Sequence, residues 1–229
     1  MRDHLETIFK RMEALWNNEI IDRCCISVTA PKDPLHPYHE EPPKSQEDLR
    51  RWYLDGEWVC RRYVERIEMT YFAGEALPAI FPYVGTGGQA KYVCDPSKVE
   101  YSPETVWIHP SIDDYETFSF AFDPDTNPVF QEELKLLSYL ANEADGRYLV
   151  GMPDNCGSYD ALAQLRGNED LLVDEQMRPF VFGLRRILAG MNNTERAAAS
   201  FIKGLKGTNT NQEFLVRSAK KHSDYEQTF

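Results

Sequence analysis

Apolar residues recur at helical spacing in several stretches of the chain, and each stretch ends at polar or glycine-containing residues. The first stretch predicts an opening helix over about residues 3–17, whose apolar side chains share one face. A long helical region is predicted after Ser45, through about Tyr71, with a break near Gly56. Further helices are predicted over about 127–144 and in short pieces between 159 and 190.

Three β-prone runs lie between these helices: CCISVTA at 24–30, ALPAIFPYVG at 76–85 and RYLVGM at 147–152. Between residues 98 and 124, apolar and polar residues alternate, which predicts a short antiparallel excursion. Strands that alternate with helices at this spacing are typical of β-α units and a parallel sheet. The predicted fold class is therefore α/β.

The composition is that of a globular chain with an acidic surface. Hydrophobic residues make up 42% of the 229 residues, and 25 Lys plus Arg against 37 Asp plus Glu leave a net charge of −12. This charge repels phosphate backbones and anionic lipids, so neither nucleic acid nor a membrane is an expected partner. The N-terminal segment lacks the apolar core of a signal peptide. The five cysteines show no C-x-x-C spacing, which favours free thiols in the cytoplasm.

The chain changes character after Gly190. All 14 prolines precede residue 180, and the segment KGLKGTNTNQ beyond Gly190 is polar and rich in glycine. One interpretation of residues 191–229 is a surface helix followed by a loose terminus. The other is a divergent, non-native tail that does not continue the fold of residues 1–190.

The stretch VGMPDNCGSYDALAQLRGNEDLLVD combines a strand, an Asp-bearing loop and a helix. Four motifs precede it in order: EIIDRCCISVTAPKDP, TYFAGEALPAIFPYVGTGG, TVWIHPSIDDYE and FDPDTNP. In this combination the chain resembles an uncharacterised branch of the uroporphyrinogen decarboxylase-like superfamily, over about residues 10–182. The resemblance implies TIM-barrel-type (β/α) units, with the active site at the carboxyl ends of the strands. With about three parallel strands, residues 1–190 are expected to form the N-terminal part of a barrel, which is incomplete.

The resemblance also bears on the reaction. Uroporphyrinogen decarboxylases carry a pair of arginines after the first strand, where they meet the carboxylates of the substrate, whereas here Lys32 is the only cation in VTAPKDP. Their second strand ends in an aspartate, and here Tyr83 lies nearest that point. The resemblance therefore implies a lyase or methyltransferase that acts on another small molecule, and decarboxylation of uroporphyrinogen is not expected.

Two alternatives to an enzyme remain open. One is a non-catalytic truncated fragment that self-associates, as a homodimer through exposed sheet edges, or binds a partner. The other is a small open α/β binding module in which EFLV, at 213–216, adds an edge strand.

The cofactor is not identified by the sequence. Methyltransferases of the superfamily bind zinc through residues in the later part of the barrel, and the resemblance does not extend to those ligands. The one compact local group of metal-binding residue types is HPYHEE, which contains His36, His39, Glu40 and Glu41. In a proline-rich loop such a group is more often exposed to solvent than bound to metal.

The turn PDNCGS is the main candidate site. If residues 148–152 form a barrel strand, Asp154, Asn155 and Cys156 stand at its carboxyl end. Asp154 is a candidate acid or base, and Cys156, before a helix, is a candidate low-pKa thiol. Asp160 either caps that helix or points into the pocket. The competing interpretation is that these residues only build a turn and a helix cap.

Other candidate residues follow the earlier strands. Lys32 and Tyr83 come after the first and second, and are expected to share a rim with Asp154. His109 and Asp113, in WIHPSIDD, are expected to reach over that rim as a lid. The glycines of GTGG at 85–88 resemble a phosphate cradle but lack the lysine spacing of a P-loop.

Overall fold

The computed structural model describes residues 2–85, 87–114, 117–119, 121–154 and 157–173. The helices are α1 (Arg2–Trp16), α2 (Gln46–Leu54), α3 (Gly56–Glu68), α4 (Pro128–Ala144), α5 (Ser158–Arg166) and α6 (Asn168–Val173). The strands are β1 (Ser27–Pro31), β2 (Thr70–Gly74), β3 (Ala79–Ile80), β4 (Val99–Tyr101), β5 (Val106–Ile108) and β6 (Leu149–Val150). Two 3₁₀ turns, η1 (Gly88–Tyr92) and η2 (Pro96–Lys98), lie between β3 and β4. The predicted change of character after Gly190 lies outside the described residues.

Helix boundaries follow from local capping. The side chains of Ser45, Asp55 and Asn127 each accept a hydrogen bond from a backbone N–H in the first turn of α2, α3 and α4, respectively. The predicted break near Gly56 is confirmed, since α2 ends at Leu54 and α3 begins at Gly56. A Cβ at Gly56 would lie 2.7 Å from Cγ of Tyr139, so the glycine also lets α4 approach.

The strands form three separate two-stranded sheets within the described residues. The pair β3–β6 is parallel, which agrees with the predicted α/β class, and β4–β5 is the antiparallel excursion predicted after residue 98. No closed barrel is formed by this part of the chain.

The first predicted strand is present as β1, but its predicted parallel neighbours were wrong. β1 pairs antiparallel with β2, with Val28 opposite Ala73 and Ala30 opposite Tyr71. The sequence assigned residues near Tyr71 to the preceding helix, yet α3 ends at Glu68 and the chain turns back along β1. Two parallel strands, rather than three, are therefore present among the residues that the structure describes.

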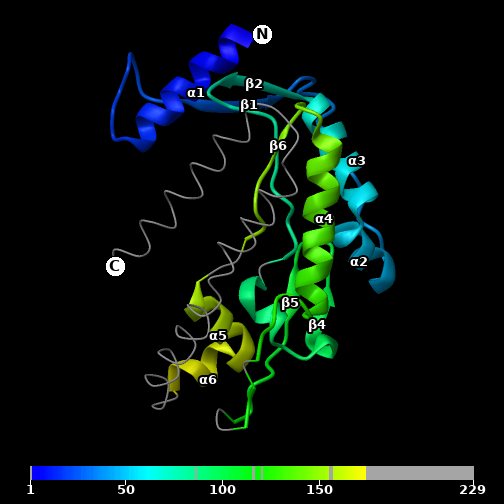
Figure 1. Cartoon of the computed structure of the whole chain (residues 1–229). Helices are drawn as coiled ribbons and strands as arrows, with labels where there is room; N and C mark the ends of the chain where they lie inside the picture. Colours follow the sequence, from blue (N-terminus) through cyan, green and yellow to red (C-terminus); the bar gives the residue numbers. More distant parts are fainter. Residues whose placement is uncertain (1, 86, 115–116, 120, 155–156, 174–229) are drawn as a thin grey trace.

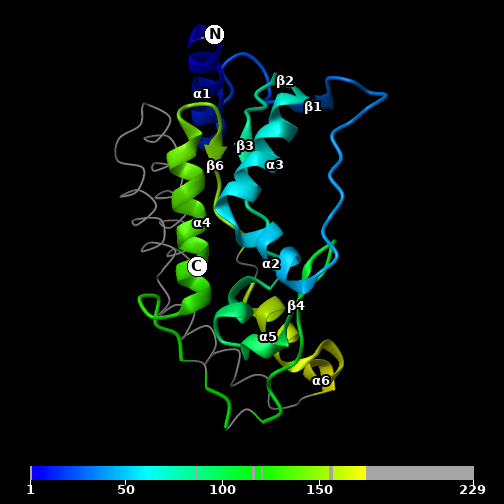
Figure 2. The same ribbon diagram turned by 90° about the vertical axis from the view of Figure 1, so that its right-hand side faces the viewer.

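The described part of the chain is elongated, with its two ends built from different elements. Figures 1 and 2 show α1 and the β1–β2 sheet at one end, α5 and α6 at the other, and α4 running between them. A connection over 32–45 runs from this sheet to α2 along one side of the described residues (Figure 2).

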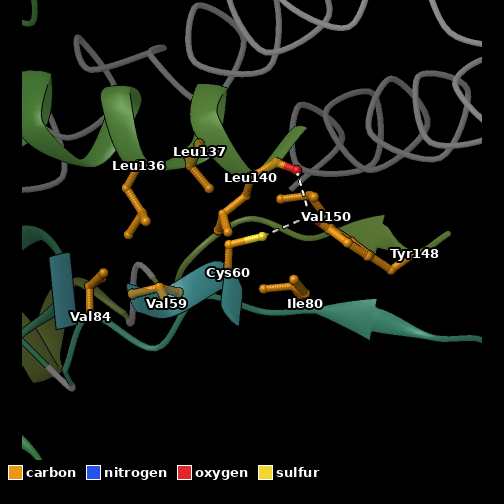
Figure 3. Close-up of a cluster of buried hydrophobic side chains, with 9 residues drawn as sticks. All are labelled: Val59, Cys60, Ile80, Val84, Leu136, Leu137, Leu140, Tyr148 and Val150. Carbon is orange, nitrogen blue, oxygen red and sulfur yellow. Dashed lines mark hydrogen bonds between the residues drawn. The ribbon is translucent and has the colours of Figure 1, made fainter. Parts of the chain in front are cut away.

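A hydrophobic core surrounds the parallel pair. Figure 3 shows side chains of α3, α4, β3 and β6 gathered between the two helices and the strands. The core residues are Val59, Cys60, Ile80, Val84, Leu136, Leu137, Leu140, Tyr148 and Val150. The hydroxyl of Tyr148 donates to the carbonyl of Leu140 at 3.1 Å and lies 3.3 Å from Sγ of Cys60. Burial raises the pKa of Tyr148, so the phenol stays neutral within this core.

A second core lies at the other end of the molecule, where α5 packs against η1 and β5. Its most buried members include Ala90, Ile112, Leu162 and Leu165. The backbone N–H groups of Ser111 and Ile112 donate to the carbonyl of Leu165, which fixes the segment after β5 to the C-terminal end of α5.

A buried carboxylate ties α1 to the β1–β2 sheet. Glu75, directly after β2, is 4% exposed and accepts hydrogen bonds from Arg11 at 3.0 Å, from Arg23 at 2.7 Å and from the N–H of Ile26 at 2.8 Å. The hydrogen bonds from Arg23 and Ile26 lower the pKa of Glu75 from 4.5 to about 2. The ionised form is therefore the one that holds the N-terminal helix in place.

Replacing Glu75 with glutamine is expected to flatten the acid dependence of stability. A carboxyl group with a lowered pKa stabilises the fold above its unfolded pKa, and this contribution is lost as pH falls from 4.5 towards 2. Urea unfolding midpoints at pH 7, 4 and 3 measure the effect. Glu6→Gln, on the exposed side of α1, is the matched control and should retain the wild-type pH profile. An identical profile for Glu75→Gln and wild type would contradict this assignment.

Among the described residues, no helix combines the length and the apolar character required to cross a membrane.

Candidate functional site

The carboxyl ends of β3 and β6 lie at one edge because the two strands are parallel. The N–H of Gly151, just after β6, donates to the carbonyl of Ile80, the last residue of β3, at 2.8 Å. A Cβ on Gly151 would lie 2.3 Å from Cδ1 of Phe81, so the ring of Phe81 packs directly on the glycine. The two segments that follow β3 and β6 thus leave the strands side by side, and Tyr83 and Asp154 lie within a few residues of the strand ends.

Tyr83 is held in a defined position by the neighbouring sheet. Its hydroxyl lies 2.7 Å from Oγ1 of Thr105, the residue before β5, and the side chain is 38% exposed. Its ring lies 6.1 Å from that of Tyr53, whose hydroxyl donates to the carbonyl of Ser102 at 2.9 Å. Burial raises the pKa of Tyr53 to about 12. Tyr83 therefore presents a partly exposed, positioned hydroxyl.

Asp154 is exposed and lies between the end of β6 and the start of α5. The next two candidates, Asn155 and Cys156, lie outside the described residues. Asp160 accepts a hydrogen bond from the N–H of Gly157 at 3.1 Å, and so caps the N-terminus of α5. The capping interpretation of Asp160 is therefore supported, whereas the role of Asp154 stays a prediction.

His109 is paired with another residue, and Asp113 lies about one helix length from Asp154. Nε2 of His109 is 2.7 Å from Oε2 of Glu100, across the β4–β5 pair. Asp113 is exposed and follows Ile112, which is bound to the C-terminal end of α5. Asp154 precedes the N-terminal end of the same helix, and nine helical residues span about 13 Å. The segment expected to form a lid therefore sits about one helix length away from Asp154.

Lys32 lies at the other end of the molecule. Its Nζ donates to the carbonyl of Glu68 at 2.7 Å, and its N–H donates to the carbonyl of Met69 at 2.8 Å. Figure 1 shows the β1–β2 sheet at the end where β6 begins, away from α5. The expectation that Lys32 shares a rim with Tyr83 and Asp154 is corrected, because β1 pairs with β2 instead of joining the parallel strands.

The HPYHEE loop is engaged in other contacts. His36 pairs with Asp33 at 2.9 Å, and His39 lies 3.3 Å from Glu41. Glu40 accepts a hydrogen bond from Nε1 of Trp58 at 3.2 Å. Within the described ranges, no group of three or more His, Cys, Asp or Glu side chains is arranged to hold a metal ion.

The glycine-rich loop after β3 serves close backbone packing. Gly85 has a φ of +90°, and a Cβ there would lie 2.4 Å from Cβ of Val106. A Cβ at Gly87 would lie 2.5 Å from Cδ1 of Ile108. Two of the glycines are thus explained by the approach of this loop to β5, which accounts for them without a phosphate.

One buried charged pair was not predicted from the sequence. Nζ of Lys91, in η1, lies 2.6 Å from Oε1 of Glu133 in α4, and the side chains are only 6% and 4% exposed. The hydroxyl of Tyr92 donates to Oε2 of Glu133 at 2.7 Å, and Asn127 donates to the carbonyl of Tyr92 at 2.7 Å. This network ties the loop that follows β3 to α4. A lysine between two apolar residues, in AKY, was the available signal.

Comparisons of the chain with protein-family models, with curated proteins and with solved structures find no match.

Proposed function

We propose that this chain carries a small-molecule site of the uroporphyrinogen decarboxylase-like type, with lyase or methyltransferase chemistry. The observation that supports it is the parallel pair β3–β6, connected through α4 and followed by α5. In such β-α units, ligands bind beyond the carboxyl ends of the strands. Tyr83 and Asp154 are the two candidates that follow those ends.

The two side chains supply complementary chemistry. The carboxylate of Asp154 accepts a proton or a hydrogen bond from a substrate group, as a general base requires. The hydroxyl of Tyr83, next to Thr105, donates to a carbonyl or carboxylate oxygen of the same ligand. Lys32, His109 and Asp113 are not part of the proposed site.

Uroporphyrinogen itself is not the proposed substrate. Its carboxylates call for several cations, and Lys32, the cation expected after the first strand, lies at the β1–β2 sheet, where it donates to the backbone carbonyl of Glu68. The net charge of −12 adds long-range repulsion of a polyanion.

A ligand panel with matched variants tests the proposal. Thermal unfolding is measured with methylated amines and thiols, with small carboxylic acids and with uroporphyrinogen III. Hits among the first two groups should stabilise the wild type, and this stabilisation should be lost in Asp154→Asn and in Tyr83→Phe. Tyr159→Phe, an exposed tyrosine on α5, is the control and should respond as wild type does. A hit that survives both site variants would contradict the proposed site, and stabilisation by uroporphyrinogen III would contradict the proposed substrate class.

A second candidate is a non-catalytic role in self-association or partner binding. The observation that favours it is β1, in which all five residues are exposed. A chain that binds none of the panel compounds but associates at rising concentration would favour this candidate.

A further inference from the structure

We propose that β1 is a dimerisation edge, at which a second copy of this chain pairs antiparallel about a twofold axis at Thr29. The β1–β2 sheet lies away from Tyr83 and Asp154, at the end of the molecule opposite α5 (Figure 1), so this inference does not depend on the proposed small-molecule site and instead rests on the second candidate function, self-association. Pairing of β1 with its own copy would join two such two-stranded sheets into one four-stranded sheet.

The free edge of β1 is defined by the register of the β1–β2 pair. The N–H of Lys32 donates to the carbonyl of Met69 across the β1–β2 pair. Backbone groups alternate in direction along an antiparallel strand, so Ala30 and Val28 also bond towards β2. Ser27, Thr29 and Pro31 therefore direct their backbone groups away from β2. Among the described residues, no other strand pairs with this edge.

The sequence of β1 suits an edge position. Proline has no N–H, and Pro31 occupies an outward position, where its ring removes no bond to β2. Native edges are commonly protected by charged side chains or by proline; SVTAP contains no charged residue, and its one proline, Pro31, removes a single outward donor. The outward edge thus retains the N–H groups of Ser27 and Thr29 and the carbonyls of Ser27, Thr29 and Pro31.

This edge is complementary to itself. With the axis at Thr29, each Thr29 N–H meets the Thr29 carbonyl of the second copy, and each Ser27 N–H meets the Pro31 carbonyl. Pro31 has no N–H to donate to the carbonyl of Ser27 in the second copy. The two bonds between the Thr29 residues and the two from Ser27 to Pro31 therefore make four backbone hydrogen bonds across the axis. A twofold axis is the commonest symmetry of homodimers.

Charge and apolar surface are compatible with this register. Lys32 lies opposite Ile26 of the second copy, so no like charges face each other across the axis. Val28, which is 48% exposed, comes to lie beside Ala30 of the second copy. A two-stranded sheet is marginally stable by itself, and two added strands supply further neighbours.

The proposed contact between two β1 strands is small, and its area limits the expected affinity of the dimer. Five residues from each copy bury less than the about 1,200 Å² that marks stable interfaces, so the dimer is expected to be weak and concentration-dependent. Each copy carries a net charge of −12, and salt screens this repulsion. Association should therefore strengthen as the salt concentration rises.

Sedimentation equilibrium of the full chain, with charge variants at the axis, tests the inference. Thr29→Lys places two like charges directly opposite each other and is expected to lower the association constant about fivefold or more. Thr29→Glu should do the same. An equimolar mixture of the two variants should recover association, because the charges opposite each other at residue 29 are then of opposite sign.

Thr117→Lys and Thr117→Glu, at an exposed threonine outside the β1–β2 sheet, are the matched controls and should leave association unchanged. Circular dichroism checks that each variant is folded. A wild-type chain that stays monomeric up to about 1 mM would overturn the proposal, since even weak specific contacts associate at that concentration. Association that Thr29→Lys leaves intact, or that the mixed variants do not restore, would also overturn it.

Discussion

Replacing Lys91 with methionine is expected to lower the free energy of unfolding by about 3–5 kcal/mol, because it removes one partner of a buried ion pair. The carboxylate of Glu133 is 4% exposed, and Lys91 lies 2.6 Å from it. Without the lysine, this carboxylate keeps the hydrogen bond from Tyr92 but loses its countercharge. Chemical denaturation followed by tryptophan fluorescence measures the change.

A double-variant cycle separates the pair from the two side chains. Lys91→Met combined with Glu133→Gln removes both charges and keeps an oxygen that accepts from Tyr92. This double variant should be more stable than Lys91→Met alone, since contacting residues couple in their effects. Lys98→Met, an exposed lysine on η2, is the control, with an expected change within about 0.5 kcal/mol. Equal stabilities of Lys91→Met and Lys98→Met would contradict the buried pair.

Leu140→Ala is expected to destabilise the chain by about 2–5 kcal/mol, through the cavity left in the core. Leu140 is fully buried and lies between α3 and the β3–β6 pair (Figure 3). Its carbonyl still accepts from Tyr148 in the variant, so the cost reports on the lost side chain. The free energy of unfolding from urea titration gives this cost directly.

Leu35→Ala is the matched control for this substitution. Leu35 is 84% exposed, so the same deletion there should change stability by no more than about 0.5 kcal/mol. If Leu140→Ala cost as little as Leu35→Ala, the core around the parallel pair would be misplaced.

Local signals predicted the helices well. Ser45, Asn127 and the break at Gly56 act within one helical turn, so a single sequence contains everything needed to place them. The parallel relation of the runs after residues 76 and 147 was predicted from the helix between them, and β3–β6 confirms it.

Long-range pairings were not predictable in the same way. The segment TYFAG, at 70–74, continues an apolar helical pattern, and it becomes β2 only because β1 lies beside it. Lys91 and Glu133 are 42 residues apart, as 133 − 91 gives, and meet because α4 packs beside η1. Lys32 was misplaced for the same reason, since its position depends on the partner of β1. His109 was expected in a lid, but Glu100, nine residues earlier, holds it within the β4–β5 pair.

The parallel β3–β6 pair is the claim on which the proposed site depends, and nuclear Overhauser contacts in the isotope-labelled chain test it most directly. The packing of the Phe81 ring on Gly151 predicts strong contacts between the ring protons and the α protons of the glycine. The bond to Ile80 predicts slow exchange of the Gly151 amide. Contacts of Ile80 with an antiparallel partner, or with Val28 and Thr29 of β1, would contradict the shared edge of Tyr83 and Asp154.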